Sequence, residues 1–187
     1  MECPPPARRP RPVSPRAPIR SCDAGACLAR PPDGGGRAPR SGRLEEELVA
    51  LRAASIPYEI VPGVPSAVAA AAAAGIPLTR RLTARRVQFV TGHDAGGALP
   101  ADIDLAALAD PLASTVVFMG KRTFPALARA LLARGLPPDQ PAILAESVSK
   151  PDQRITRATV ADLAGRLAAE TSPLPALILY GPLAEGP

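Results

Sequence analysis

The pattern of hydrophobic and polar positions changes near residue 44. Apolar residues show no sustained period over residues 1–43, whereas Leu44, Leu48 and Leu51 recur at the spacing of an α-helix. This spacing predicts an amphipathic helix that ends near residue 55. An aperiodic segment is therefore followed at once by regular secondary structure.

From this helix onward, short apolar runs alternate with helical patterns, and Gly or Pro residues separate them. The predicted strands cover residues 56–61, 87–90, 114–118, 143–148, 154–158 and 176–180, and the further predicted helices cover residues 65–74, 124–134 and 159–169. The strands at 143–148 and 154–158 are close enough to form a hairpin, whereas the others are separated by helices. The expected class is therefore α/β with a mixed sheet.

Composition and charge set residues 1–43 apart as a Pro/Arg/Gly-rich tail. Nine arginines against three acidic residues give this segment a net charge of +6, while the remainder of the chain carries −1. The tail cannot bury enough apolar surface to fold, so we expect it to be disordered. Three interpretations stay open: a non-native sequence from a frame error or wrong start, an inert tail, and a basic binding arm. The near-neutral remainder argues against a nucleic-acid-binding protein.

All three cysteines, Cys3, Cys22 and Cys27, lie in this tail, with spacings that fit neither a zinc site nor a CxxC redox motif. We therefore expect no metal. No secretory apolar segment follows Met1, and the longest apolar run, around residues 67–74, is shorter than the roughly 20 residues that span a bilayer. We expect a cytoplasmic protein that does not associate with membranes.

Six segments carry a resemblance that covers about three quarters of the chain. In order, they are VPGVPSA, GIPLTRR, FVTGHD, VVFMGKRTFPALARALLARGLPP, AESVSKPDQRITRATVADLA and PALILYGP. Together they resemble the uroporphyrinogen-III C-methyltransferases of the tetrapyrrole methylase family, which use S-adenosylmethionine. A run of six ordered segments is much more specific than one short motif.

The resemblance implies two α/β domains with S-adenosylmethionine in the cleft between them. Residues 44–78 would be a remnant of the first domain and residues 79–187 a complete second domain. The implied reaction converts uroporphyrinogen III to precorrin-2 in sirohaem and cobalamin biosynthesis, and loss of the N-terminal half is expected to impair it. The resemblance also implies a homodimer. The alternatives are a non-enzymatic α/β binding or dimerisation module and another methylase of the same family.

The resemblance further implies which residues contact the cofactor. The glycine-rich first loop of the family has no counterpart in this chain, and the Gly-Gly-Asp loop aligns with Gly35-Gly36-Arg37. The three remaining contacts fall at Pro65-Ser66, at Met119 and at Val148. On the residues alone, Pro65-Ser66 is also a plain helix start and Met119 a core side chain.

The implied substrate carries many carboxylates, so basic groups are expected near the cleft. The candidates are Arg80, Arg81, Lys121 and Arg122, with Arg85 and Arg86 nearby, and the single histidine, His93. Each also has an ordinary interpretation as a surface or structural residue. Glu146 has no feature that identifies it as a base, and the catalytic residues stay unassigned.

Overall fold

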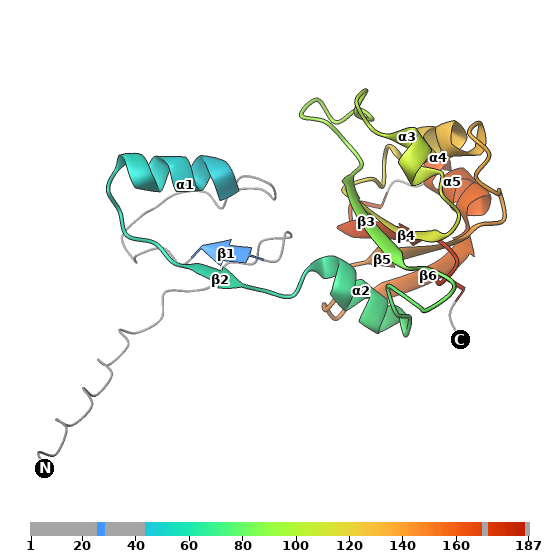
Figure 1. Ribbon diagram of the computed structural model, residues 1–187, viewed down its shortest axis with the longest axis horizontal. Coiled ribbons are helices and arrows are strands. Elements are labelled where there is room, and N and C mark those ends of the chain that lie inside the picture. The colour runs from blue at the N-terminus through green and yellow to red at the C-terminus, as the bar shows by residue number, and fades with distance from the viewer. Residues whose placement is uncertain (1–25, 29–43, 170–171, 186–187) are drawn as a thin grey trace, which may run out of the picture. The chain divides into compact units, whose positions relative to one another are not determined.

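A computed structural model describes residues 26–28, 44–169 and 172–185 of the 187-residue chain (Figure 1). The chain divides into two compact units, Met1–Val64 and Pro65–Pro187. The candidate cofactor and substrate residues that the structure describes all belong to the second unit.

The described part of the first unit contains one helix and a two-stranded sheet. Its elements are β1 (Ala26–Leu28), α1 (Leu44–Ala53) and β2 (Ile60–Pro62), and β1 pairs antiparallel with β2. Helix α1 confirms the prediction from leucine spacing, whereas the strand predicted over 56–61 forms only toward its end. Residues 26–28 differ from the predicted disorder because their backbone groups pair with β2. The rest of the tail lies outside the described residues.

Within the described residues, the second unit is built on a five-stranded mixed sheet of order β3-β4-β7-β5-β6. The strands are β3 (Arg86–Thr91), β4 (Ala113–Phe118), β5 (Pro141–Glu146), β6 (Arg154–Thr159) and β7 (Ala176–Tyr180). β3 and β4 are parallel, and β7 is antiparallel to both β4 and β5. Strands β3, β4 and β5 therefore end at one edge, here named the carboxyl edge. The predicted α/β fold with a mixed sheet is confirmed.

Three helices cover one face of this sheet (Figure 1). They are α3 (Leu105–Leu108), α4 (Phe124–Leu132) and α5 (Val160–Ala169). Phe124 and Leu127 of α4 and Leu163 of α5 are fully buried in the same cluster as Val117 and Ile178 of the sheet. Because alternate strand residues point to opposite faces, one set of apolar strand residues forms this core.

Local signals explain where these helices begin and end. Gly135 follows α4 with a φ of +92°, a conformation in which glycine is favoured, as the sequence predicts. The Thr159 hydroxyl accepts a hydrogen bond of 3.1 Å from the Asp162 amide at the start of α5, so the predicted N-terminal cap forms. The short helix α3 was not predicted. Its start depends on Asp104, whose carboxylate accepts hydrogen bonds from the amides of the first turn.

Helix α2 (Ser66–Ala74) packs on the other face of the sheet (Figure 1). Its buried side chains are all alanines: Ala67, Ala70, Ala71 and Ala74. These small side chains let the helix approach the sheet closely, and Gly75 ends it at a φ of +69°. Since α2 belongs to the same compact unit as the sheet, residues 65–78 are packed with the predicted second domain. The assignment of residues 44–78 to a first domain stays a prediction.

Candidate functional site

The turns that follow β4 and β5 leave the sheet at the same level. Phe118 of β4 and Ala145 of β5 both lie opposite Leu177 of the intervening strand β7. Met119 and Glu146, one residue further along each strand, are therefore level with each other on the two sides of β7 at the carboxyl edge. Ligands of open α/β sheets bind outside the carboxyl ends of the strands, so this edge is the candidate ligand-binding site.

The turn after β3 is locked to the turn after β4. The Gly92 amide donates a hydrogen bond of 2.7 Å to the Phe118 carbonyl, and the Thr123 hydroxyl donates to the Gly92 carbonyl. A Cβ atom on Gly92 would lie 2.5 Å from the Cα atom of Gly120. Only glycine permits this approach. The TGH and MGK segments are therefore held together as one unit, an arrangement that the sequence analysis missed.

His93 begins the turn that leaves β3, and it is half-buried. Its Nδ1 atom lies 2.8 Å from the Asp94 carbonyl oxygen. Because a carbonyl only accepts, Nδ1 carries the proton of this hydrogen bond. A Cβ atom on Gly97 would lie 2.5 Å from Nη2 of Arg122. The Arg122 guanidinium therefore lies against the turn that His93 begins, which brings two predicted substrate residues to one region.

Met119 has an unusual backbone and a partly accessible side chain. Its φ is +52°, in the left-handed region that residues other than glycine seldom adopt. The residue is 37% exposed. A strained backbone at a strand end, carrying a side chain that reaches solvent, is typical of a ligand-contacting position.

Lys121 points into the protein. Its Nζ atom lies 2.6 Å from Oε1 of Glu146 and 3.3 Å from the Ser172 carbonyl oxygen. The Lys121 and Glu146 side chains are only 14% and 4% exposed. The sequence analysis proposed this ammonium for substrate carboxylates, whereas in the structure a buried glutamate and a backbone carbonyl surround it. The role of Lys121 in substrate binding stays a prediction.

The other predicted cofactor residues lie on the α2 side of the sheet. Val148 is half-buried and packs against the cluster that contains α2. Pro65 is the N-cap residue of α2 with a φ of −60°, and no side chain caps the helix there. Ser66 is the first helical residue and is half-buried. The segment Gly35-Gly36-Arg37 lies outside the described residues.

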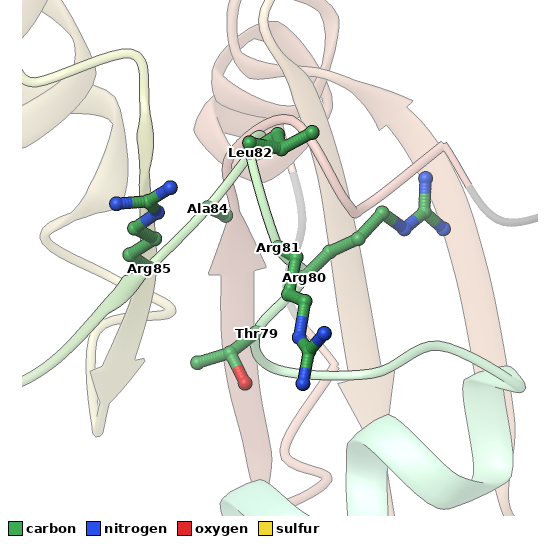
Figure 2. A pocket seen from close by; sticks show the side chains of 6 residues that line it. All are labelled: Thr79, Arg80, Arg81, Leu82, Ala84 and Arg85. Atoms are coloured by element: carbon green, nitrogen blue, oxygen red, sulfur yellow. The ribbon is translucent and has the colours of Figure 1, made fainter.

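Arg80 and Arg81 lie on a loop that leads into the amino end of β3. The Arg80 amide donates a hydrogen bond of 2.9 Å to the Ala84 carbonyl, which closes a tight turn. This loop surrounds a hollow of about 680 Å³ that is open to solvent. Figure 2 shows that the guanidinium groups around it, including Arg85, point in different directions. These arginines therefore lie at the amino end of β3, whereas His93 and Lys121 lie at the carboxyl edge of the sheet.

Two kinds of feature are absent from the part of the chain that the structure describes. There, no group of three or more His, Cys, Asp or Glu side chains is arranged to hold a metal ion. None of the helices within the described ranges is long and apolar enough to cross a membrane.

Known proteins resemble this chain over most of its length. A siroheme synthase of Gluconacetobacter diazotrophicus is 43% identical over 141 residues, which cover 75% of this chain and 30% of that protein. The uroporphyrinogen-III C-methyltransferase of Paracoccus denitrificans is 38% identical over 143 residues, or 76% of this chain and 50% of that protein. The chain therefore spans only a third to a half of these relatives.

A solved structure agrees with the sequence comparisons. The uroporphyrin-III C-methyl transferase from Thermus thermophilus, complexed with S-adenyl homocysteine, matches with a TM-score of 0.64 and 34% identity. The match covers 77% of this chain and 61% of that one. The family model of the tetrapyrrole (corrin/porphyrin) methylases matches residues 38–164, which is more than half of the chain. The chain therefore belongs to the tetrapyrrole (corrin/porphyrin) methylase family.

Proposed function

We propose that this chain takes part in S-adenosylmethionine-dependent C-methylation of uroporphyrinogen III, which yields precorrin-2 for sirohaem or cobalamin. The observation that carries the proposal is that the turns at Gly92, Met119 and Ser147 all leave the sheet at one edge. The relative named as a uroporphyrinogen-III C-methyltransferase supports the substrate. The T. thermophilus structure with S-adenyl homocysteine supports the cofactor.

The residues at the carboxyl edge suit the apolar part of such a cofactor. Met119 offers an accessible thioether side chain, and Val148 offers a half-buried apolar one. Pro65 and Ser66 at the start of α2 are the third proposed contact. When bound, S-adenosylmethionine supplies a methyl group activated by its sulfonium charge. The chain's own task is to hold the acceptor carbon in line with that methyl group and to exclude water.

The proposed substrate needs cations that hold its carboxylates. Arg122 and His93 are the candidates at the carboxyl edge, because the Arg122 guanidinium lies against the turn that His93 begins. A guanidinium binds a carboxylate through two parallel hydrogen bonds, which orients it as well as attracting it. Arg80 and Arg81 at the opposite end of β3 are proposed as a more distant attractive surface.

A partner-binding module, including a homodimer, is the second candidate. It is favoured by Phe89 on the edge strand β3, which is 56% exposed and whose ring lies 5.9 Å from that of Phe118. Large exposed aromatic side chains mark protein interfaces when they gather on one face. Sedimentation of the chain at high concentration tests this candidate, since a purely monomeric protein would contradict it.

Titration calorimetry of the purified chain with S-adenosylhomocysteine tests the enzymatic proposal. We expect micromolar binding that Met119→Ala weakens about tenfold, whereas Leu112→Ala leaves it unchanged because Leu112 is 64% exposed on the amino side of β4. A folded chain that binds no ligand would contradict the proposal. Methyl transfer to uroporphyrinogen III by the same preparation then tests the predicted impairment of the reaction. The cytoplasmic location stays a prediction.

A further inference from the structure

We propose that Lys121 and Glu146 are positioning residues that hold the two cofactor-facing turns of the carboxyl edge in register. The inference rests on the proposed function, in which Met119 and Val148 contact the cofactor. Lys121 follows Met119 by two residues, and Glu146 precedes Val148 by two. The ion pair therefore joins the turn after β4 to the last residue of β5, where the turn that carries Val148 begins.

The topology explains why such a connection is needed. Strands β4 and β5 do not pair with each other, because β7 lies between them. No backbone ladder joins their carboxyl ends directly. The Lys121 ammonium crosses this gap at 2.6 Å from Glu146 and at 3.3 Å from the Ser172 carbonyl, on the segment that leads into β7. One side chain thus contacts all three neighbouring segments.

Backbone strain lies next to both members of the pair. Met119 has a φ of +52° and Ser147 a φ of +47°. Such conformations persist in residues other than glycine only where the surroundings hold them. Ser147 is also held by its amide, which donates to the Pro175 carbonyl at 2.9 Å. Among the described residues, the ion pair links the strained turn after β4 to the end of β5, next to the strained residue Ser147.

Burial separates this pair from an ordinary surface ion pair. Exposed pairs contribute little because water screens them and their side chains are mobile. Lys121 and Glu146 are nearly enclosed, at 14% and 4% exposure, so their geometry is fixed. The chain has one other lysine, Lys150, which is exposed in the β5–β6 turn and provides a control for the loss of a lysine side chain outside the pair.

The main test replaces both partners together. The double variant Lys121→Met/Glu146→Met removes the connection without leaving a buried charge unpaired, so the chain is expected to fold. We expect its affinity for S-adenosylhomocysteine to fall at least tenfold in calorimetry, whereas Lys150→Met binds as the unmodified chain does. Equal affinity of the double variant and the unmodified chain would overturn the proposal.

Amide hydrogen exchange supplies a readout that does not depend on the ligand. The Ser147 amide bonds to Pro175 and the Thr123 amide to the Gly120 carbonyl at 3.0 Å, so each reports on one turn. In the double variant both amides should exchange at least ten times faster, while those of Val116 and Ile143 inside the strands stay unchanged. If the unmodified chain binds no S-adenosylhomocysteine, the proposed function is refuted, but the positioning role can still be tested by exchange. Unchanged exchange of the Ser147 and Thr123 amides in the double variant would overturn the positioning role.

Discussion

Gly92 and Gly120 approach each other so closely that a Cβ atom on Gly92 would lie 2.5 Å from the Cα atom of Gly120. Gly92 directly follows β3 and Gly120 follows β4 by two residues, and the Gly92 amide closes the contact by donating a hydrogen bond to the Phe118 carbonyl. The β3 and β4 turns are thus joined by backbone packing, whereas the β4 and β5 turns are joined through the side chains of Lys121 and Glu146. The carboxyl edge depends on both connections.

The glycine contact predicts that Gly92→Ala destabilises the chain. The added methyl group would meet both the Gly120 backbone and the Val117 side chain, and overpacking of this kind costs roughly 1–3 kcal/mol. Urea unfolding of the variant measures the loss. Gly165→Ala is the matched control, because its Cβ atom meets nothing within 4 Å on α5. This control should stabilise the chain by roughly 0.5–1 kcal/mol, since alanine favours the helix. Equal effects of both variants would contradict the described contact.

The alanine face of α2 predicts that leucine substitutions at Ala70 and Ala72 change the free energy of unfolding by different amounts. Ala70 is fully buried against the sheet, whereas Ala72 is exposed. Ala70→Leu inserts a side chain where the helix approaches the sheet, so it should lower the free energy of unfolding by about 1–3 kcal/mol. Ala72→Leu should change it by less than about 0.5 kcal/mol, as for other surface substitutions. Thermal or urea unfolding distinguishes the two variants. Tolerance of leucine at both positions would mean that α2 does not pack as described.

The elements predicted best are those whose signals are local. Gly75 and Gly135 end their helices in the left-handed conformation, as their positions after helical patterns predict. The strands of the five-stranded sheet lie within about two residues of the predictions, because turn residues bound each apolar run. The strand near residue 60 was shifted because it depends on pairing with residues 26–28, far away in the sequence. Helix α3 is too short to show a period.

The sequence predicts which site residues lie at strand ends, but it does not predict the directions in which their side chains point. The apolar pattern placed His93 and Met119 just after predicted strands, the family resemblance gave them expected roles, and the structure brings these strand ends to one edge. No pattern in the sequence reveals that Lys121 turns inward, because its partner Glu146 is 25 residues away. The mutual approach of Gly92 and Gly120 is likewise a tertiary feature. In the sequence, Gly92 and Gly120 each follow a predicted strand by two residues, and this spacing is the local signal that agrees with the contact.

The buried ion pair predicts that a single substitution lowers the free energy of unfolding much more than the double substitution does. Lys121→Met leaves the Glu146 carboxylate buried without its cation, and such a change costs about 3–5 kcal/mol. Lys121→Met/Glu146→Met removes both charges, so most of that loss should be recovered. Urea unfolding of the unmodified chain, both single variants and the double variant gives the coupling energy between the two side chains. A double variant as unstable as the sum of the singles would show that the two groups do not interact.

Tyr180 predicts a loss of stability in alkali. The side chain is fully buried, and its hydroxyl donates a hydrogen bond of 2.9 Å to the Leu108 carbonyl, joining β7 to α3. Burial raises the pKa of Tyr180 well above its ordinary value, and the contact with the Thr115 hydroxyl lowers it by less. Below about pH 10 the phenol is protonated in both the folded and the unfolded chain, so it adds no dependence on pH.

Above about pH 10 the unfolded chain releases this proton while the folded chain retains it. The unfolded state then binds fewer protons, so the free energy of unfolding falls as pH rises, by up to about 1.4 kcal/mol per pH unit. Tyr180→Phe should cost about 1 kcal/mol at pH 7 through the lost hydrogen bond. It should also make the decline above pH 10 shallower, because phenylalanine has no proton to lose. Urea unfolding of the unmodified chain and of Tyr180→Phe between about pH 8 and about pH 11 measures both effects, because this range includes the ordinary pKa of a tyrosine phenol. Parallel curves for the two chains over this range would mean that the Tyr180 hydroxyl is not held protonated in the core.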